Sequence, residues 1–134
     1  MKDAVGRLGP VWLSHFNKNE GLEAQNFNEE GFIKAAKLRA EPPASYPGSF
    51  YVQLLATRGP LWINAGDGIV NHATILTGAR TDKDGRVAFR LVDPAKGAFL
   101  TQSEDQFGVD FEREAWVIYN QNLNWEFRYQ IFHW

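Results

Sequence analysis

The spacing of hydrophobic residues changes near Gly59. Before this residue, apolar side chains recur at the three- and four-residue intervals of amphipathic helices. After it, apolar and polar residues alternate, as they do in half-buried strands. The pattern predicts an α+β fold, with short helices first and a mostly antiparallel β-sheet after them.

Three helices are expected in the first part of the chain. One spans about residues 10–20, because proline suits a first helical turn and apolar residues follow on one stripe. A second begins after Asn28, a residue type that caps helices. A third runs from Ser49 to a stop at Gly59. The prolines within residues 41–48 predict a loop between the last two helices.

The second part of the chain is expected to form strands separated by turns rich in Gly, Asp and Asn. The expected strands span residues 61–64, 69–78, 86–92, 115–120 and 125–132. The clearest turn is Thr81-Asp82-Lys83-Asp84-Gly85, a composition typical of hairpins. No repeat or shift in composition divides the chain, so a single domain over residues 1–134 is expected.

Composition narrows the classes of function. The chain has 134 residues, and a hydrophobic content of 44% is ample for a packed core. A net charge of -2 provides no positive field for phosphate backbones or anionic membranes, so neither nucleic acid nor a membrane is an expected partner. No stretch is typical of a signal peptide or a membrane span. A cysteine count of zero excludes disulfides and thiol nucleophiles in these residues.

His72 is the histidine with a plausible chemical context. His15 falls within the first expected helix and His133 lies at the end of the chain. A hairpin folded around Lys83 places His72 and Asp93 within a residue or two of each other at its open end. They are the candidate catalytic residues: a base and the carboxylate that orients it. Spacing alone leaves open a surface histidine beside an aspartate that starts a turn.

Metal and cofactor sites are not expected. The turn from Asp82 to Gly85 resembles the start of a calcium loop, but Arg86 takes a ligand position and the flanks are strands. The three histidines lack the paired spacing of zinc sites. We therefore predict no metal and no cofactor.

Aromatic residues are dense near the C-terminus. They are Trp116, Tyr119, Trp125, Phe127, Tyr129, Phe132 and Trp134. Core packing is the simpler interpretation. The alternative is an exposed adhesive patch that favours dimers or a partner protein.

Several short segments, in order and at their spacings, carry a family resemblance. They are Gly59-Pro60-Leu61-Trp62-Ile63, Asn71-His72-Ala73, Leu76-Thr77-Gly78 and Val92-Asp93-Pro94. Together they resemble bacterial papain-like cysteine peptidases, and the resemblance extends from Leu8 to about Phe107. It implies that His72 matches the catalytic histidine and Asp93 the third member of the triad. It also suggests a secreted bacterial effector or toxin.

The chain departs from the family pattern at the nucleophile. The family places its cysteine, and an oxyanion-hole glutamine, upstream of the position of Leu8, where this sequence has seven residues and neither type. Ser14 is no substitute, because its neighbour His15 would point about 100° away on a helix. The resemblance therefore implies a His–Asp half that is inactive alone, with the cysteine segment lost or supplied elsewhere, for example by another chain or a second copy. The alternative is a catalytically dead binding module for a peptide or protein partner.

Overall fold

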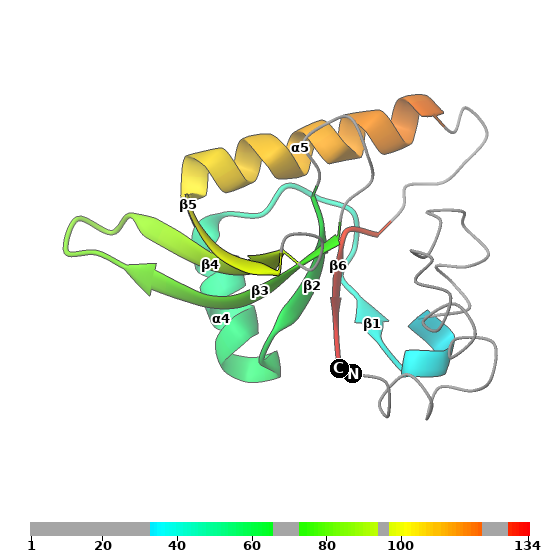
Figure 1. The fold of residues 1–134 in the computed structure, drawn as a ribbon, viewed down its shortest axis with the longest axis horizontal. Coiled ribbons are helices and arrows are strands. Elements are labelled where there is room, and N and C mark those ends of the chain that lie inside the picture. Colours follow the sequence, from blue (N-terminus) through cyan, green and yellow to red (C-terminus); the bar gives the residue numbers. More distant parts are fainter. Residues whose placement is uncertain (1–32, 66–72, 94–96, 122–128) are drawn as a thin grey trace. The chain divides into compact units, whose positions relative to one another are not determined.

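The computed structural model describes residues 33–65, 73–93, 97–121 and 129–134 (Figure 1). The chain divides into two compact units, one of residues 1–39 with Trp134 and one of Ala40–His133. In the first unit, residues 33–36 are helical and Lys37 ends them at a φ of 56°. This confirms the described part of the second expected helix. The first expected helix lies outside the described residues.

Six strands form one sheet in the order β1-β6-β2-β3-β4-β5. Their bounds are β1 Arg39–Ala40, β2 Leu61–Asn64, β3 Ala73–Thr81, β4 Val87–Asp93, β5 Ala98–Ser103 and β6 Ile131–His133. β2 pairs antiparallel with β3 and β6, and β4 pairs antiparallel with β3 and β5. The predicted α+β class is confirmed.

The structure agrees with some of the expected strands and differs from others. β2 matches its prediction, and β4, the hairpin and the described part of the expected strand over residues 69–78 are confirmed, with β4 shifted by one residue and β3 extended to Thr81. Residues 69–72 of that expected strand lie outside the described part of the chain. β5 was not predicted, and β6 covers only the last part of the expected strand over residues 125–132. Residues 125–128 lie outside the described part of the chain.

The strand expected over residues 115–120 is wrong, because these residues belong to the helix α5, Glu104–Gln121. The Ala-Trp-Val-Ile-Tyr run has strand-like composition. The helix begins upstream, where the Ser103 hydroxyl accepts the Gln106 N–H at 3.2 Å. Phe107 and Phe111, one turn apart, are then buried together. Tertiary packing thus overrides the local preference of the last turns.

Helix α4, Gly48–Arg58, begins one residue before its expected start. Its N-cap residue, Pro47, offers no side-chain hydrogen bond, and instead the Gly48 N–H donates to the Glu104 Oε1 at 2.6 Å. The first residue of α5 therefore satisfies the start of α4. The predicted stop at Gly59 is confirmed: this residue has a φ of 80° and donates to the Leu55 carbonyl.

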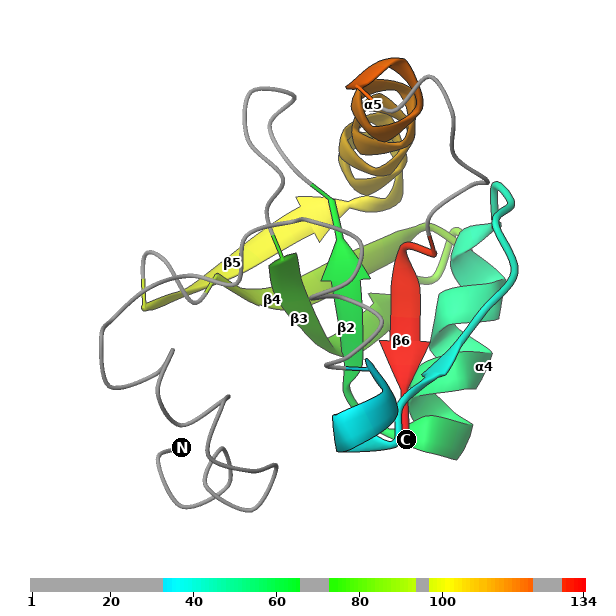
Figure 2. The same cartoon turned by 90° about the vertical axis from the view of Figure 1, so that its right-hand side faces the viewer.

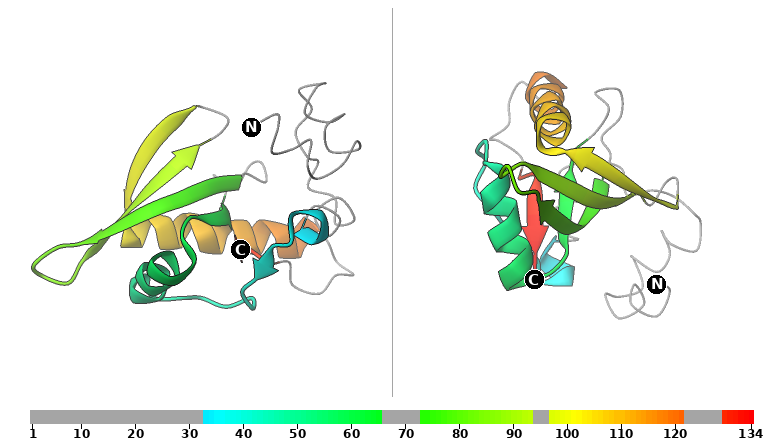
Figure 3. Two further views of the ribbon diagram at one scale, coloured as in Figure 1. Left: turned by 90° about the horizontal axis from the view of Figure 1, so that it is seen from below. Right: turned by 90° about the vertical axis from the view of Figure 1, so that its left-hand side faces the viewer.

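The core lies between one face of the sheet and both helices, which stand on the same side of the hairpin strands (Figure 2; Figure 3, left). Alternate residues of β4, beginning with Val87, are buried on that face. The Tyr51 ring of α4 lies 5.6 Å from Phe89 and 5.0 Å from Phe107. One aromatic cluster therefore joins α4, β4 and α5. No helix in the described part of the chain is long and apolar enough to cross a membrane.

Candidate active site

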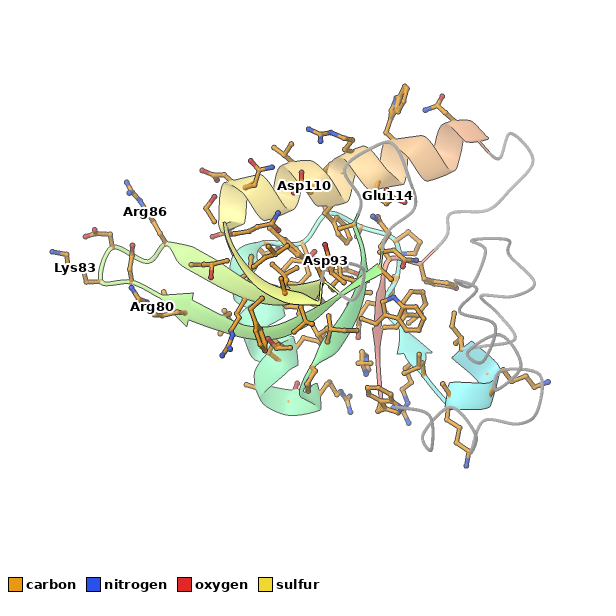
Figure 4. The ribbon with its side chains drawn as sticks, in the orientation of Figure 1. Arg80, Lys83, Arg86, Asp93, Asp110 and Glu114 are labelled. Carbon is orange, nitrogen blue, oxygen red and sulfur yellow. The ribbon has the colours of Figure 1, made fainter. Side chains whose placement is uncertain are left out.

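Asp93 ends β4 at the opposite end of the hairpin from its tip. Figure 4 shows it below α5, whereas Arg80 and Lys83 lie toward the projecting tip. Its side chain is 2% exposed, and the alternation along β4 places it on the core face with Leu91. Ala98 of β5 pairs with it. We call this end the open end of the sheet. It is formed by the terminal residues of three strands, which are Asn64 of β2, Ala73 of β3 and Asp93 of β4.

His72 lies outside the described residues. The next residue, Ala73, begins β3 and pairs with Asn64. The β3–β4 pairing agrees with the predicted register as far as Ile75, which pairs with Val92, the neighbour of Asp93. A register shift between Leu76 and Gly78 absorbs one residue nearer the tip. That His72 lies within a residue or two of Asp93 stays a prediction.

A side-chain amide binds the open end to α5. The Gln130 Nε2 donates to the Asn64 carbonyl at 3.0 Å and to the Phe111 carbonyl at 2.9 Å. The Asn64 N–H in turn donates to the Gln130 carbonyl at 2.8 Å. Both backbone groups of Asn64 are thus held by one buried residue, directly opposite the first residue of β3. Sequence reasoning missed Gln130, whose signal was one polar residue among the apolar residues at the end of the chain.

Other polar side chains are buried among the strands and on α5. Thr74 lies on the core face of β3, and its hydroxyl has no hydrogen-bond partner among the residues that the structure describes. Glu114 is fully buried, one turn after Phe111 on α5 (Figure 4). Burying ionisable groups costs free energy unless they are paired or bonded. Three polar side chains are thus buried within the core-facing surfaces of β3, β4 and α5: Thr74, Asp93 and Glu114.

A histidine–carboxylate pair that the sequence did not indicate joins His133 and Glu41. The His133 Nε2 lies 2.8 Å from the Glu41 Oε1, and the ring is 3% exposed. We interpret this pair as structural, because a ring so thoroughly buried in β6 offers no surface to a substrate. His15, the remaining histidine, lies outside the described residues.

The turn that resembles the start of a calcium loop is closed chiefly by the Asp82 carboxylate, which bonds to backbone groups of the same turn. The Asp82 Oδ1 accepts the N–H groups of Asp84 and Arg86, each at 2.9 Å. Gly85 takes a φ of 79° there. Among the residues that the structure describes, no group of three or more His, Cys, Asp or Glu side chains could hold a metal ion.

The family model described as papain-like cysteine protease AvrRpt2 matches residues 15–111. The chain belongs to this family. The match covers more than half of the sequence and includes the positions of His72 and Asp93. No curated protein and no solved structure shows significant similarity to the chain. Family membership makes this a papain-like cysteine peptidase domain and implies a protein substrate. The helices and antiparallel sheet are consistent with that fold.

Proposed function

We propose that the chain supplies the histidine–aspartate half of a papain-like cysteine peptidase. His72 is the general base and acid, and Asp93 holds the imidazole in the required tautomer and stabilises its cation. The observation that supports this most is the position of Asp93, which is buried at the open end. Its neighbour Val92 pairs with Ile75, and Ile75 follows His72 by three residues.

The chemistry follows from these roles. His72 accepts the thiol proton, the thiolate attacks the acyl carbon, and a tetrahedral oxyanion forms. His72 then protonates the departing amine, which leaves an acyl-thioester. A water molecule, deprotonated by His72, attacks the thioester, and the tetrahedral intermediate collapses by breaking the carbon–sulfur bond, which releases the carboxylic acid. The expelled thiolate takes its proton back from the His72 imidazolium, so the thiol and the neutral histidine are restored. Asp93 keeps its charge throughout and favours the imidazolium that appears in each half-reaction.

The sulfur must come from outside these 134 residues, because the sequence has no cysteine. A low-pKa thiolate is the nucleophile of this mechanism, so the chain alone forms no acyl-enzyme. The missing segment is either another part of the same gene product or another chain. A secreted bacterial effector or toxin is the setting that the family resemblance suggests.

The dyad can be tested without any thiol, by titrating the His72 imidazole with NMR. A neighbouring carboxylate favours the imidazolium, so Asp93→Asn lowers the pKa of His72. Asp84→Asn, an exposed aspartate at the hairpin tip, is the matched control and leaves that pKa unchanged. A His72 titration that is the same in the parent and both variants overturns the dyad.

The catalytic claim is tested by intact-mass labelling with a thiol-reactive peptidase probe. The chain is compared alone and together with a cysteine-bearing segment, expressed from the full reading frame or added in trans. We expect labelling and thiol-dependent peptide hydrolysis only when the segment is present, and loss of hydrolysis in His72→Gln. Labelling without hydrolysis would contradict the proposed role of His72.

A second candidate is a binding module that recognises a peptide or protein partner. The observation that favours it is the lack of cysteine in a chain whose family depends on one. This candidate predicts that the chain is stable and captures a partner. It also predicts that the product of the full reading frame does not react with the thiol probe. A cysteine-bearing helix in the upstream reading frame would count against it.

A further inference from the structure

β5 is an edge strand of the sheet. It pairs with β4 along its whole length, from Ala98 opposite Asp93 to Ser103 opposite Ala88. Within the described residues, no strand pairs with its other side. It follows the hairpin strands and leads directly into α5 (Figure 1; Figure 3, right). One row of its backbone groups thus has no strand partner in the part of the chain that the structure describes, the arrangement from which strand addition starts.

The sequence of β5 does not protect this edge. Ala-Phe-Leu-Thr-Gln-Ser contains no charged residue and no proline, the two residue types that most often block edge pairing. Phe99 is 63% exposed, and Thr101 and Ser103 are exposed on the same face. Edges of this kind bind extended peptides by strand addition.

A positive charge and an aromatic ring beside the edge favour peptides with acidic side chains. The Arg90 guanidinium lies 4.2 Å from the centroid of the Phe99 ring, and Arg90 itself is exposed on the neighbouring strand opposite Thr101. This cation–π pair places a positive group beside the free edge. An acidic side chain on an added strand would meet that group. The opposite face of β5 offers Leu100, which is half-buried and suits a small apolar side chain.

The edge also leads to the open end. Because Ala98 pairs with Asp93, the first residue of β5 and the candidate catalytic aspartate lie side by side. A strand added antiparallel to β5 would run in the direction of β4, toward the open end. Its backbone would lie about 10 Å, two strand spacings, from β4. A peptide bound there would deliver its following residues to the neighbourhood of Asp93.

We propose that the free edge of β5 binds an extended segment of the protein substrate by strand addition, with acidic side chains at alternate positions facing Arg90 and Phe99. The choice of a peptide as ligand rests on the proposed function, but the binding itself needs neither His72 nor a thiol.

The test uses isotope-labelled chain and a blocked peptide of alternating glutamate and valine, Thr-Glu-Val-Glu-Val-Glu-Val-Thr. We expect its addition to about 1 mM to shift the amide signals of residues 98–103. Phe99→Ala and Arg90→Gln should each weaken binding about tenfold. Lysine in place of glutamate, or proline in place of valine, should abolish it.

Matched variants test whether the site is specific to this edge. Trp116→Ala removes a comparably exposed aromatic residue from α5, at 67% exposure, and Arg80→Gln removes an exposed arginine from β3. Both should bind the peptide as the parent chain does. Binding unaffected by Phe99→Ala and Arg90→Gln, signals that shift on α5 instead of β5, or no binding at all would overturn the proposal. So would dimerisation of the chain through β5 in sedimentation.

The outcome is separable from that of the dyad. Peptide binding at β5 with no response of His72 to Asp93→Asn would support the docking edge and reject the dyad. The reverse result would support the dyad and reject the docking edge.

Discussion

The two ends of the β3–β4 hairpin are built in different ways. At the tip, the bonds that hold the turn join residues within four positions of one another, chiefly through the Asp82 carboxylate. At the open end, Gln130 holds Asn64, which lies 66 residues away in the chain, and also the Phe111 carbonyl of α5. The same two strands thus end in a local structure on one side and a long-range one on the other.

This difference matters for function, because the candidate catalytic aspartate lies at the long-range end. A site held by Gln130, the residue before β6, and by the Phe111 carbonyl of α5 forms only when those segments have docked. The tip needs none of them. Changes that loosen docking should therefore disturb the open end first, and changes at the tip should leave it intact.

The largest effect is expected from Phe107→Ala. This ring lies 4.7 Å from Phe89 and anchors α5 to β4. Its removal leaves a cavity and should lower the free energy of unfolding by about 3–5 kcal/mol. Urea denaturation measures the change. Val109→Ala, at an exposed position on the same helix, is the control and should cost less than about 0.5 kcal/mol. Equal losses would show that α5 is not anchored through Phe107.

Gln130→Met should have the next largest effect. The variant keeps the length of the side chain but leaves the Asn64 carbonyl without its side-chain donor, at a cost of about 1–3 kcal/mol. Native-state hydrogen exchange should quicken at Asn64 and Ala73 and not at Arg86. Gln102→Met, which loses its hydrogen bond to Asp110, is the matched control. If both variants changed hydrogen exchange equally at Asn64, Ala73 and Arg86, Gln130 would have no special role at the open end.

Asp82→Ala should have a smaller and strictly local effect. The loss of its bonds to the N–H groups of Asp84 and Arg86 should cost about 1 kcal/mol, because both bonds are exposed. The NMR signals of Ala73 and Asp93 should stay in place. A shift of those signals as large as the shift at Gly85 would break the distinction between the two ends. Asp84→Ala provides the control at the same turn.

Tyr51→Phe should have the smallest effect at neutral pH and a clear one in alkali. Burial, and then the charge of Glu112, raise the pKa of the Tyr51 phenol above its usual 10.0. Well below pH 10.0, the Tyr51 phenol is protonated in both the folded and the unfolded chain. As the pH rises above this value, the unfolded chain ionises first, so stability is lost. Unfolding measured near about pH 8 and pH 11 should show that Tyr51→Phe loses less stability than the parent over this interval.

Tyr129→Phe is the control for this measurement, because Tyr129 is exposed. An alkaline loss of stability that is the same in the parent and Tyr51→Phe would contradict the assignment. Since Tyr51 packs against Phe89 and Phe107, this titration reports on the core that both ends of the hairpin share.

The sequence predicted the candidate site in part. Local patterns located the strand that ends near Asp93 and the hairpin register, and the motifs around His72 and Asp93 indicated the family that the match to residues 15–111 confirms. The burial of Gln130 and Glu114 was not predicted. A lone polar residue in an apolar run has no local signature that distinguishes a buried role from an exposed one.

The sequence by itself determined what short-range chemistry controls: the turn closed by Asp82, the stop of α4 at Gly59, and the alternation that defines β2 and β4. Only the tertiary structure decided that residues 115–120 belong to a helix, that His133 pairs with Glu41, and that Gln130 joins Asn64 to α5. The first group depends on backbone conformation and bonds between near neighbours. The second depends on partners 19 to 92 residues apart or on burial against the sheet, which no local pattern encodes.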